Sequence, residues 1–309
     1  METKDSPKLT ISITNFNTRH FLQMCLESIY KTTKEIPIEI IVVDNASIDG
    51  SPEVLEREFP QVKLIRNETD LGFGRANNKA IRVANGEYIL ILSSDVILLP
   101  QTLEKMVEFM DDNPNVGVVT PKLLNPDMTL QKSIAHFPTL KYELFLRLPY
   151  FSRYFDIYNF NHNKLQEIEN FTGACYLVRK KVIDQIGGFD EDFYLYVEET
   201  EWFFRMRKNG IRIYFLPQTE VIHYGGASTK NRIERTIMYY KSLLLFFKKA
   251  YGMFKLFLLR IISIISNTLS IIKLPLIIIL PKSKRKDSEL QETRLSLEIL
   301  RLNLLFYPK

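Results

Sequence analysis

Apolar runs and amphipathic stretches alternate along the first hundred residues. The apolar runs predict strands at 9–15, 39–45, 62–67 and 87–95. Between and after them, apolar positions recur at helical spacing, which predicts helices from about residue 21, over 51–59, over 74–84 and over 101–112. The runs are continuous rather than alternating, as in strands buried on both faces, so the pattern predicts an α/β fold with a parallel sheet.

The second half of the chain has a more mixed pattern. Strands are predicted at 116–124, 171–180 and 211–224, and helices at 180–187 and 197–209. The span 135–169 is aromatic-rich and irregular, which is typical of a long substrate lid. In the first half, the 51–59 helix is expected to begin with Ser51 as N-cap and Pro52 as its first residue.

Polar residues follow three of the predicted strands. Thr14-Asn15, Asp44-Asn45 and Ser93-Ser94-Asp95 each end an apolar run. Because ligands of open parallel sheets bind beyond the carboxyl ends of the strands, these residues predict a binding edge. Asp44 is suited to accept a hydrogen bond from the N–H of a nucleotide base, or it closes the strand in an Asx turn.

Composition narrows the class of protein. The 309 residues, 46% hydrophobic and 25% charged, suffice for one large domain and an appendage. Cys25 and Cys175 form no C-x-x-C pair, which fits a reducing cytosol, and residues 1–8 show no charged-then-apolar leader, so no secretory signal is expected. From Tyr240 onward, 13 Lys and Arg oppose four acids, giving +9 against −4 for 1–239. This asymmetry predicts a catalytic part and a basic part that contacts an anionic surface.

The segment Gly72-Phe73-Gly74-Arg75 resembles a dinucleotide-binding fingerprint only in part. It lacks the third glycine and follows the third strand rather than the first. Its glycines allow close approach of the backbone to a ligand, and Arg75 is suited to a phosphate. The alternative is a glycine turn before a helix, with a solvated arginine.

Five segments, in this order and spacing, resemble the family-two inverting glycosyltransferases, and among them the rhamnosyltransferase-like branch that builds cell-surface polysaccharides. They are VVDNASIDGS, NETDLGFGRANNKAI, LILSSDV, TGACYLVRKKVIDQIGGFDEDFYLYVEETEWFFRMRKNG and VIHYGG, and the resemblance covers about residues 8–250. It implies a GT-A fold: a Rossmann-like, mixed, mainly parallel sheet flanked by helices. It also implies a nucleotide-sugar donor and a divalent metal, Mg²⁺ or Mn²⁺. The residues that it assigns to the donor are Thr14, Asn15, Asp44, Asn45, Gly72, Phe73, Arg75, Asn77, Ser93 and Ser94.

The resemblance also assigns the metal ligands. The family's D-x-D element falls on Ser93-Ser94-Asp95, so a serine replaces the first acid and Asp95 is the remaining carboxylate. One carboxylate, with diphosphate oxygens and water, is able to hold Mg²⁺. His223 in VIHYGG matches a histidine that completes the metal site in some relatives. The alternative for a lone histidine at a strand end is a structural hydrogen bond.

The catalytic base is expected in the acidic cluster that opens the 197–209 helix. Glu198, Glu199 and Glu201 match the family's E-D-x-D, with Glu199 as the base, although Asp is usual there. Glu198 would orient donor or acceptor, and Glu201 would support the helix or the acceptor pocket. Acids packed this closely raise one another's pKa, although helix N-termini favour acids in any case. On the acceptor side, Gly173 and Trp202 are candidates, with Trp202 either a sugar-facing wall or a core residue.

The C-terminal region predicts contact with a membrane. Residues 256–280 are strongly apolar but carry a polar stripe, which is expected of a helix that lies in the bilayer interface. The stripe consists of Arg260, Ser263, Ser266, Asn267, Ser270 and Lys273. The basic cluster 282–286 is suited to anionic lipid. A helix packed on the catalytic domain or on a homodimer partner, and a single membrane span, are the alternatives.

These patterns predict a catalytic domain over 1–240 (a nucleotide half at about 8–115 and an acceptor half at 116–240) and a membrane-associated tail over 241–309. The expected enzyme is an inverting glycosyltransferase, peripheral or monotopic on the cytoplasmic face of the membrane. Its expected donor is dTDP-rhamnose, with UDP-hexoses next, and its acceptor a glycan or a polyprenyl-linked glycan; no nucleic acid partner is expected. A non-catalytic scaffold with the same fold and a sugar nucleotidyltransferase are the rival functions, although TNFNTRHF (14–21) offers no phosphate loop for the latter.

Overall fold

The computed structural model describes residues 6–147, 160–226, 231–272, 287–306 and 308. The chain forms two compact units, and each is described by itself. The first consists of 1–137, 158–194 and 198–228, and the second of 138–157, 195–197 and 229–309.

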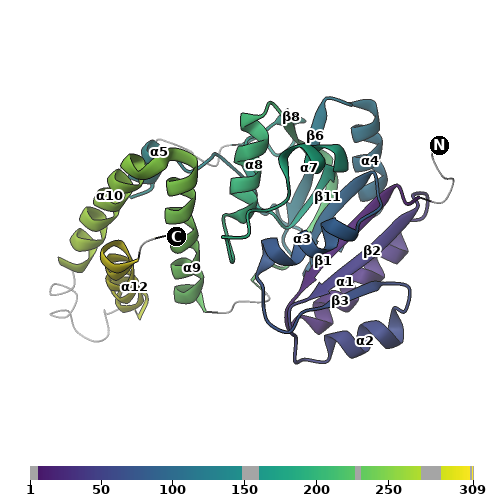
Figure 1. Cartoon of the computed structure of the whole chain (residues 1–309), viewed down its shortest axis with the longest axis horizontal. Helices are drawn as coiled ribbons and strands as arrows, with labels where there is room; N and C mark the ends of the chain where they lie inside the picture. Colours follow the sequence, from purple (N-terminus) through teal and green to yellow (C-terminus); the bar gives the residue numbers. More distant parts are fainter. Residues whose placement is uncertain (1–5, 148–159, 227–230, 273–286, 307, 309) are drawn as a thin grey trace. The chain divides into compact units, whose positions relative to one another are not determined.

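The first unit is built on a nine-stranded sheet (Figure 1). Eight strands follow the order β3-β2-β1-β4-β10-β6-β11-β5, and β8 pairs with β11. Their bounds are β1 Leu9–Asn15, β2 Ile38–Asp44, β3 Lys63–Arg66, β4 Tyr88–Ser93, β5 Val96–Leu98, β6 Val116–Leu124, β8 Gln166–Glu167, β10 Cys175–Arg179 and β11 Arg212–His223. A small second sheet pairs β7 (Ile134–Ala135) with β9 (Asn170–Phe171).

The sheet is mixed: β10 runs antiparallel to both of its neighbours in the middle of the sheet, and β5 and β8 run antiparallel to β11. β3, β2, β1 and β4 run parallel, and β6 and β11 run parallel, but β10 is antiparallel to both β4 and β6. The register pairs Asn15 with Asp44 and Thr14 with Ser93, so the polar strand ends line up along one edge. The predicted mixed, mainly parallel sheet is therefore confirmed.

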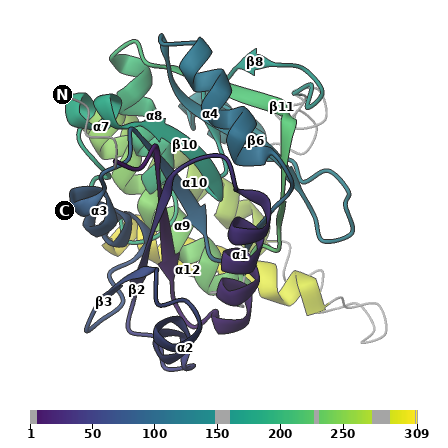
Figure 2. The same ribbon diagram turned by 90° about the vertical axis from the view of Figure 1, so that its right-hand side faces the viewer.

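Two apolar clusters cover the two faces of this sheet. Leu26 of α1, Leu55 of α2 and Met106 of α4 pack on one face. Ile183 of α7 and Phe203 of α8 pack on the other, with α3 over β1 and β2. Figure 2 shows β1 and β2 between α1 and α3. The helix bounds are α1 Arg19–Thr32, α2 Ser51–Glu58, α3 Phe73–Val83, α4 Thr102–Asp112, α7 Lys180–Ile186 and α8 Glu198–Lys208.

Two local predictions are wrong. Ser51 is not the N-cap of α2: Gly50 takes that position, with φ of 83°, and no side chain caps the helix. The span 135–169 is not a continuous irregular loop, because it contains helix α5 (Leu140–Arg147) and strand β8. The strand predicted at 87–95 is confirmed as β4, which ends at Ser93 in a turn at Ser94-Asp95, before β5 begins at Val96.

The second unit is helical. It contains α5, α9 (Arg232–Phe246), the π-helical turn η1 (Phe247–Tyr251), α10 (Gly252–Ile272) and α12 (Asp287–Leu305). α12 packs against α10 and α9, and α5 packs against α10. The predicted domain boundary at 240 falls inside α9. α9, η1 and α10 follow one another without an intervening loop from Arg232 to Ile272, a 41-residue span that by length and composition could cross a membrane. Gly252, with φ of 83° and ψ of 175°, breaks the helical path between η1 and α10, so the span is not one straight helix.

Candidate active site

A buried polar network joins the ends of the central parallel strands. The Nδ2 of Asn15 donates to Asp44 Oδ1 (2.7 Å) and to Ser47 Oγ (3.0 Å). Thr18 Oγ1 donates to Asn15 Oδ1 (2.7 Å) and shares a hydrogen bond with Ser94 Oγ (2.7 Å). The predicted residues of three strands are thus brought together at one edge, and Thr18 and Ser47 join them.

Asp44 closes its strand as an Asx turn. The second carboxylate oxygen of Asp44 accepts from the N–H of Ser47 (2.9 Å), and the residue is 2% exposed. The neighbouring Asn45 holds the glycine loop, because its Nδ2 donates to Gly72 O (3.2 Å) and its Oδ1 accepts from Asn67 (2.8 Å). Of the two roles predicted for Asp44, the described contacts show the Asx turn. A base-binding role stays a prediction.

The glycine loop fits its surroundings only because Gly72 has no side chain. Its φ is 77°, and a Cβ at this position would meet the carbonyl oxygen of Tyr194 at 1.9 Å. That carbonyl accepts from the N–H of Phe73 (3.2 Å), and the Tyr194 hydroxyl donates to Asp70 (2.7 Å). Burial and the hydrogen bond to Asp70 raise the pKa of Tyr194 to about 12. Tyr194 thus fixes the loop, although no motif singles it out in the sequence.

Two residues assigned to the donor face the interior instead. Asn77 is 0% exposed, and its amide accepts from Ser12 Oγ (2.7 Å) and donates to Phe73 O (3.0 Å). The Phe73 ring packs edge-to-face on Phe189. Asn77 therefore joins α3 to β1, and its contact with the donor stays a prediction. Arg75 stays exposed, with its Nε bonded to Glu191 O (2.6 Å).

Asp95 and His223 face each other at the end of β11. His223 Nε2 lies 3.6 Å from Asp95 Oδ1, and both side chains are largely buried. Gln131 orients the imidazole: its Nε2 donates to the His223 carbonyl (3.1 Å), so its Oε1, at 2.6 Å, must accept from Nδ1–H. The lone pair of neutral His223 is therefore on Nε2, toward Asp95. Burial lowers the pKa of His223, which favours this neutral form, although Asp95 opposes the shift.

This pair fits a divalent metal. A carboxylate oxygen and an imidazole lone pair would repel each other across 3.6 Å, and a cation between them removes that repulsion. The hydrogen bond from Nδ1 to Gln131 is the second contact typical of metal-binding histidines. No group of three or more His, Cys, Asp or Glu able to hold a metal occurs among the described residues. The remaining ligands would come from the donor's diphosphate and from water.

Glu198 and Glu199 begin α8 with carboxyl oxygens that lack partners. Within the described part of the chain, one Oε2 of each residue is buried without a hydrogen bond. Burial raises the pKa of Glu199, although backbone N–H groups including that of Gly173 oppose the shift. Burial and the charge of Glu199 raise the pKa of Glu198 well above its usual range. These are groups suited to take up a proton near neutral pH.

Gly173 connects this acid pair to the strand edge. A Cβ on Gly173 would lie 3.0 Å from Glu199 Cγ, so the glycine leaves space for the glutamate. The next residue, Ala174, accepts from the N–H of Ser93 (2.8 Å), two residues before Asp95. Glu199 and Asp95 therefore belong to the same edge of the sheet, where β10 begins and β4 ends.

The backbone before α8 is strained. Tyr196 and Val197 have φ of 64° and 67°, a conformation that bulky and β-branched residues rarely adopt. Each such residue costs about 1–3 kcal/mol, and such strain clusters at active sites. The chain therefore reaches Glu198 through a local conformation that propensity alone would not produce.

The other two acceptor-side candidates of α8 are held by the core. Glu201 bonds Arg205 (2.7 and 3.0 Å), whose guanidinium also donates to the carbonyls of Ile186 and Gly188. Trp202 is 0% exposed, and its Nε1 donates to Gly187 O (2.8 Å). Glu201 thus supports the helix, and Trp202 takes the core position that was its alternative.

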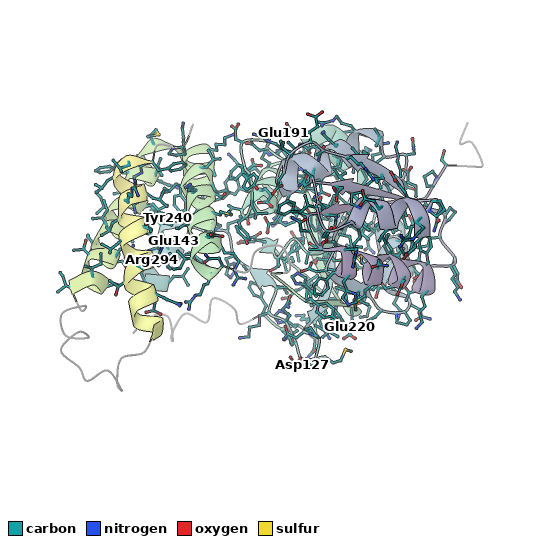
Figure 3. The ribbon with its side chains drawn as sticks, turned by 90° about the horizontal axis from the view of Figure 1, so that it is seen from below. Asp127, Glu143, Glu191, Glu220, Tyr240 and Arg294 are labelled. Carbon is teal, nitrogen blue, oxygen red and sulfur yellow. The ribbon has the colours of Figure 1, made fainter. Side chains whose placement is uncertain are left out.

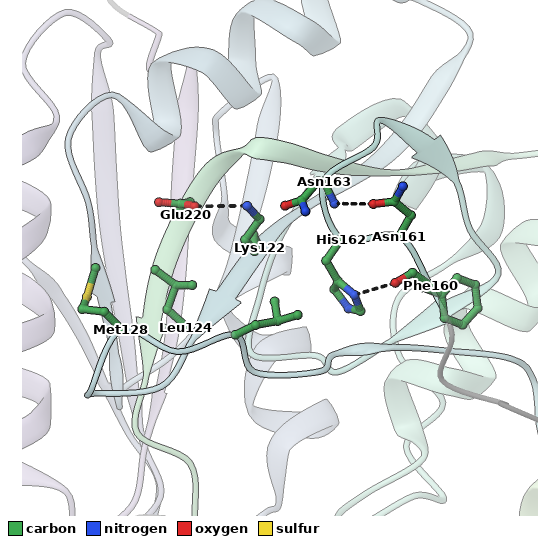
Figure 4. Close-up of a pocket in the computed structure, with 9 residues that line it drawn as sticks. Lys122, Leu124, Met128, Phe160, Asn161, His162, Asn163 and Glu220 are labelled. Atoms are coloured by element: carbon green, nitrogen blue, oxygen red, sulfur yellow. Dashed lines mark hydrogen bonds and ion pairs between the residues drawn. The ribbon is translucent and has the colours of Figure 1, made fainter. Parts of the chain in front are cut away.

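A separate pocket of about 720 Å³ contains none of these residues (Figure 4). Lys122 and Glu220, from the neighbouring strands β6 and β11, form an ion pair of 3.2 Å in its lining. Phe160, Asn161 and Asn163 also line it. Amide and charged groups beside an aromatic ring are suited to hydroxyl-rich ligands.

The sequence of the chain is similar to those of known glycosyltransferases. Residues 10–187 match the family described as Glycosyl transferase family 2, so the chain belongs to this family. An N-acetylglucosaminyl-diphospho-decaprenol L-rhamnosyltransferase of Mycobacterium tuberculosis is 26% identical over 212 residues, covering 63% of this chain and 69% of the relative. The O-antigen biosynthesis protein RfbC of Myxococcus xanthus is 28% identical over 234 residues, covering 74% of this chain and 18% of that protein.

A solved structure shows the same fold. The mannosyltransferase PcManGT of Pyrobaculum calidifontis, in complex with GDP-Man and Mn²⁺, has a TM-score of 0.61 at 17% identity, covering 98% of this chain and 88% of that one. The fold is therefore GT-A, and the chain is a glycosyltransferase of polysaccharide or glycan synthesis.

Proposed function

We propose that this protein is an inverting glycosyltransferase that transfers L-rhamnose from a nucleotide-diphosphate donor to a glycan acceptor at the cytoplasmic face of a membrane. The main support for this reaction is that a candidate metal site and a candidate base lie at the same edge of the sheet. Asp95 faces His223 at 3.6 Å, and the Glu199 carboxyl has a buried oxygen without a partner among the described residues.

The choice of donor and acceptor rests on the relatives. The mycobacterial relative is named for transfer of L-rhamnose to N-acetylglucosaminyl-diphospho-decaprenol, and the Myxococcus relative for O-antigen biosynthesis. dTDP-rhamnose is therefore the favoured donor and a UDP-hexose the next. A polyprenyl-diphosphate-linked N-acetylglucosamine is the favoured acceptor.

On the donor side, the chain would provide a rigid, buried frame. Asn15, Asp44 and Ser94 are held by their mutual network, and Asn45 and Tyr194 fix the backbone of Gly72. Groups held before substrate arrives lose little entropy when it binds. Asp95 and His223 would hold Mg²⁺ or Mn²⁺, which, when bound, neutralises the charge that grows on the departing diphosphate.

On the acceptor side, Glu199 would act as general base. Its carboxylate takes the proton of the acceptor hydroxyl while that oxygen bonds to the anomeric carbon and the bond from this carbon to the diphosphate breaks. Attack opposite the leaving group inverts the anomeric configuration. Because burial raises the pKa of Glu199, the group is a stronger base than an exposed glutamate.

A donor panel tests this function. The full chain is incubated with dTDP-rhamnose, UDP-glucose, UDP-N-acetylglucosamine or GDP-mannose and a short-chain polyprenyl-diphosphate N-acetylglucosamine, with Mn²⁺ or with EDTA. The expected result is metal-dependent transfer with dTDP-rhamnose at least about tenfold faster than with the other donors. Transfer that prefers another donor would overturn the rhamnose assignment, and no transfer from any donor would overturn the proposed reaction.

A further inference from the structure

One face of α10 exposes large apolar side chains along most of its length. Phe254 is 72% exposed, Phe257 58%, Ile265 56%, Leu269 57% and Ile272 63%. Spacings of three, four and eight residues bring them to one side of the helix. This surface, the apolar face of α10, is larger and more continuous than the scattered apolar residues of an ordinary protein surface.

The opposite side of α10 is buried, and it combines two leucines, Leu256 and Leu259, with polar residues. Ser263 is 0% exposed, and its hydroxyl accepts from the Nδ2 of Asn303 in α12 (3.1 Å). Asn303 is 4% exposed, and its Oδ1 accepts from the Tyr240 hydroxyl of α9 (2.9 Å). One asparagine therefore joins three helices through hydrogen bonds between buried side chains.

Other polar side chains of α12 are buried as well. Thr293 and Ser296 of α12 are 6% and 7% exposed, whereas Leu304 is 73% exposed. Arg260 donates to the carbonyls of Asn303 (3.3 Å) and Phe306 (2.5 Å), so its charge also faces α12. Glu143 of α5 is a further buried polar residue of this unit: it is 2% exposed and forms an ion pair with Arg147 (Figure 3, where Glu143 and Tyr240 are labelled).

Part of the polar stripe of α10 thus faces α12 rather than lipid headgroups, whereas Ser270 of the same stripe is exposed. The sequence pattern placed Arg260, Ser263 and Asn267 toward lipid headgroups, but Arg260 and Ser263 bond α12, and Asn267 bonds Ser263 (2.7 Å to its carbonyl). The predicted Lys273 and the basic cluster 282–286 lie outside the described residues. What α10 leaves on the surface is its apolar face.

An arrangement with polar contacts inside and leucine and isoleucine outside is unfavourable in water. Water drives apolar surface inward at about 25 cal/mol per Å², and it solvates hydroxyls and amides well. In hydrocarbon both preferences reverse: helices associate through small and polar residues such as Ser, Thr and Asn, and apolar side chains face the lipid. The exposed face of α10 therefore has the polarity expected of a surface solvated by lipid.

We propose that the apolar face of α10 is embedded in the acyl-chain region of a lipid bilayer. Three further observations favour lipid over a second copy of the chain. The helical span from Arg232 to Ile272 has a mean hydropathy of 1.7 in its most apolar 18-residue window, and only 17% of that window is buried. α10, with 21 residues, is about 30 Å long, close to the thickness of a bilayer's hydrocarbon core. The chain from Tyr240 onward carries +9, which complements anionic lipid.

This proposal is independent of the sugar and the reaction, so its test measures binding rather than transfer. The full chain is mixed with vesicles of phosphatidylcholine and phosphatidylglycerol and separated by flotation. The test variant carries Phe257→Ser, Ile265→Ser and Leu269→Ser. The control is Ile48→Ser, which removes an apolar residue that is 92% exposed in the first unit.

Wild type and the control are expected to float with the vesicles, and the triple variant is expected to bind at least tenfold more weakly. Equal binding by the triple variant, or no binding by wild type, would overturn the proposal. A lipid-free dimer that the triple substitution abolishes, without any change in flotation, would assign the face to a second copy instead. Circular dichroism and donor binding of the triple variant, unchanged from wild type, exclude misfolding as the cause.

A spin label measures the position of the face directly. Cys25 and Cys175 are both 0% exposed, so Ile265→Cys and Ile48→Cys each introduce one accessible thiol. In vesicles, a nitroxide at 265 is expected to be relaxed more strongly by oxygen, which concentrates in lipid, than by a water-soluble nickel chelate. A nitroxide at 48 should show the reverse. The same aqueous accessibility at both positions would contradict insertion.

Discussion

The two units differ in the role of their buried polar residues and in the exposure of their large apolar ones. In the first unit, Trp202, Phe203 and Tyr176 fill the interior, and most of the polar network lies at the carboxyl ends of strands. In the second, Ser263 and Asn303 are interior beside leucines, whereas the large side chains on the apolar face of α10 are exposed. The difference teaches that a buried polar group has two distinct roles. At the sheet edge it prepares a site for a ligand, and between the helices it joins one helix to the next.

The largest expected effect is on catalysis at the sheet edge. Glu199→Gln keeps an oxygen to accept from the Gly173 N–H but removes the base. Transfer should fall by about 10²–10⁴-fold, while donor affinity changes by less than about threefold. Steady-state transfer and calorimetric titration with the nucleotide sugar provide the measurement. A variant with wild-type turnover would show that the acid pair serves the fold rather than the reaction.

A large effect on stability is expected where the donor loop meets Tyr194. Gly72 and Gly210 have φ of 77° and 76°, but only Gly72 has an atom within reach of an added Cβ. Gly210→Ala should cost about 1–2 kcal/mol through backbone strain alone. Gly72→Ala should cost at least about 2 kcal/mol more, because the Cβ would overlap the Tyr194 carbonyl. Urea unfolding of both variants measures the difference; equal losses would mean that the loop moves freely away from Tyr194.

A smaller effect is expected on metal affinity. Gln131→Leu removes the acceptor that keeps the proton of His223 on Nδ1. Affinity for Mn²⁺ in the presence of the donor should fall by about 10–100-fold. The matched control is Lys132→Met, on the neighbouring exposed residue. Electron paramagnetic resonance of free Mn²⁺ reports the affinity, and an unchanged value would remove His223 from the metal site.

The smallest effect concerns the pH dependence of stability. Because the pKa of Glu198 is raised in the folded protein, the folded state holds a proton that the unfolded state releases above about pH 4.5. Stability therefore falls as pH rises from about 4.5 through the folded pKa. Glu198→Gln should remove this fall, so the variant should be more stable than wild type at neutral pH and equally stable at pH 4, as measured by urea unfolding at both pH values. Parallel curves for the two proteins would mean that Glu198 ionises normally.

The sequence predicted the regular elements of the first unit well. The predicted bounds of β1 and β6 agree with the structure, because long apolar runs bounded by polar residues identify buried strands. The three-residue β5 is too short to show a period, and its place beside β11 depends on pairing between distant residues. Helix α5 occurs in a span whose aromatic residues follow no clear helical period, so the pattern could not distinguish it from a loop.

Only part of the site was predicted, because contacts between residues far apart in the sequence leave no pattern along the chain. Motif positions identified Asp95, His223 and Glu199, but Gln131 is 92 residues from His223 and belongs to no motif. Nothing in a linear pattern shows that its amide orients an imidazole. Likewise, the spacing of Ser263 and Asn267 identified one face of α10 correctly but not its neighbour. Whether that face meets lipid headgroups or another helix depends on α12, which only the tertiary structure places.

The most direct test of single displacement between Glu199 and a diphosphate held near Asp95 is the anomeric configuration of the product. Nuclear magnetic resonance of the purified product, compared with the nucleotide sugar, gives the configuration of the new linkage. Inversion relative to the donor is the expected result, since attack and departure take place on opposite faces of one carbon. Retention would require a covalent intermediate or same-face attack and would contradict the role of Glu199 as base.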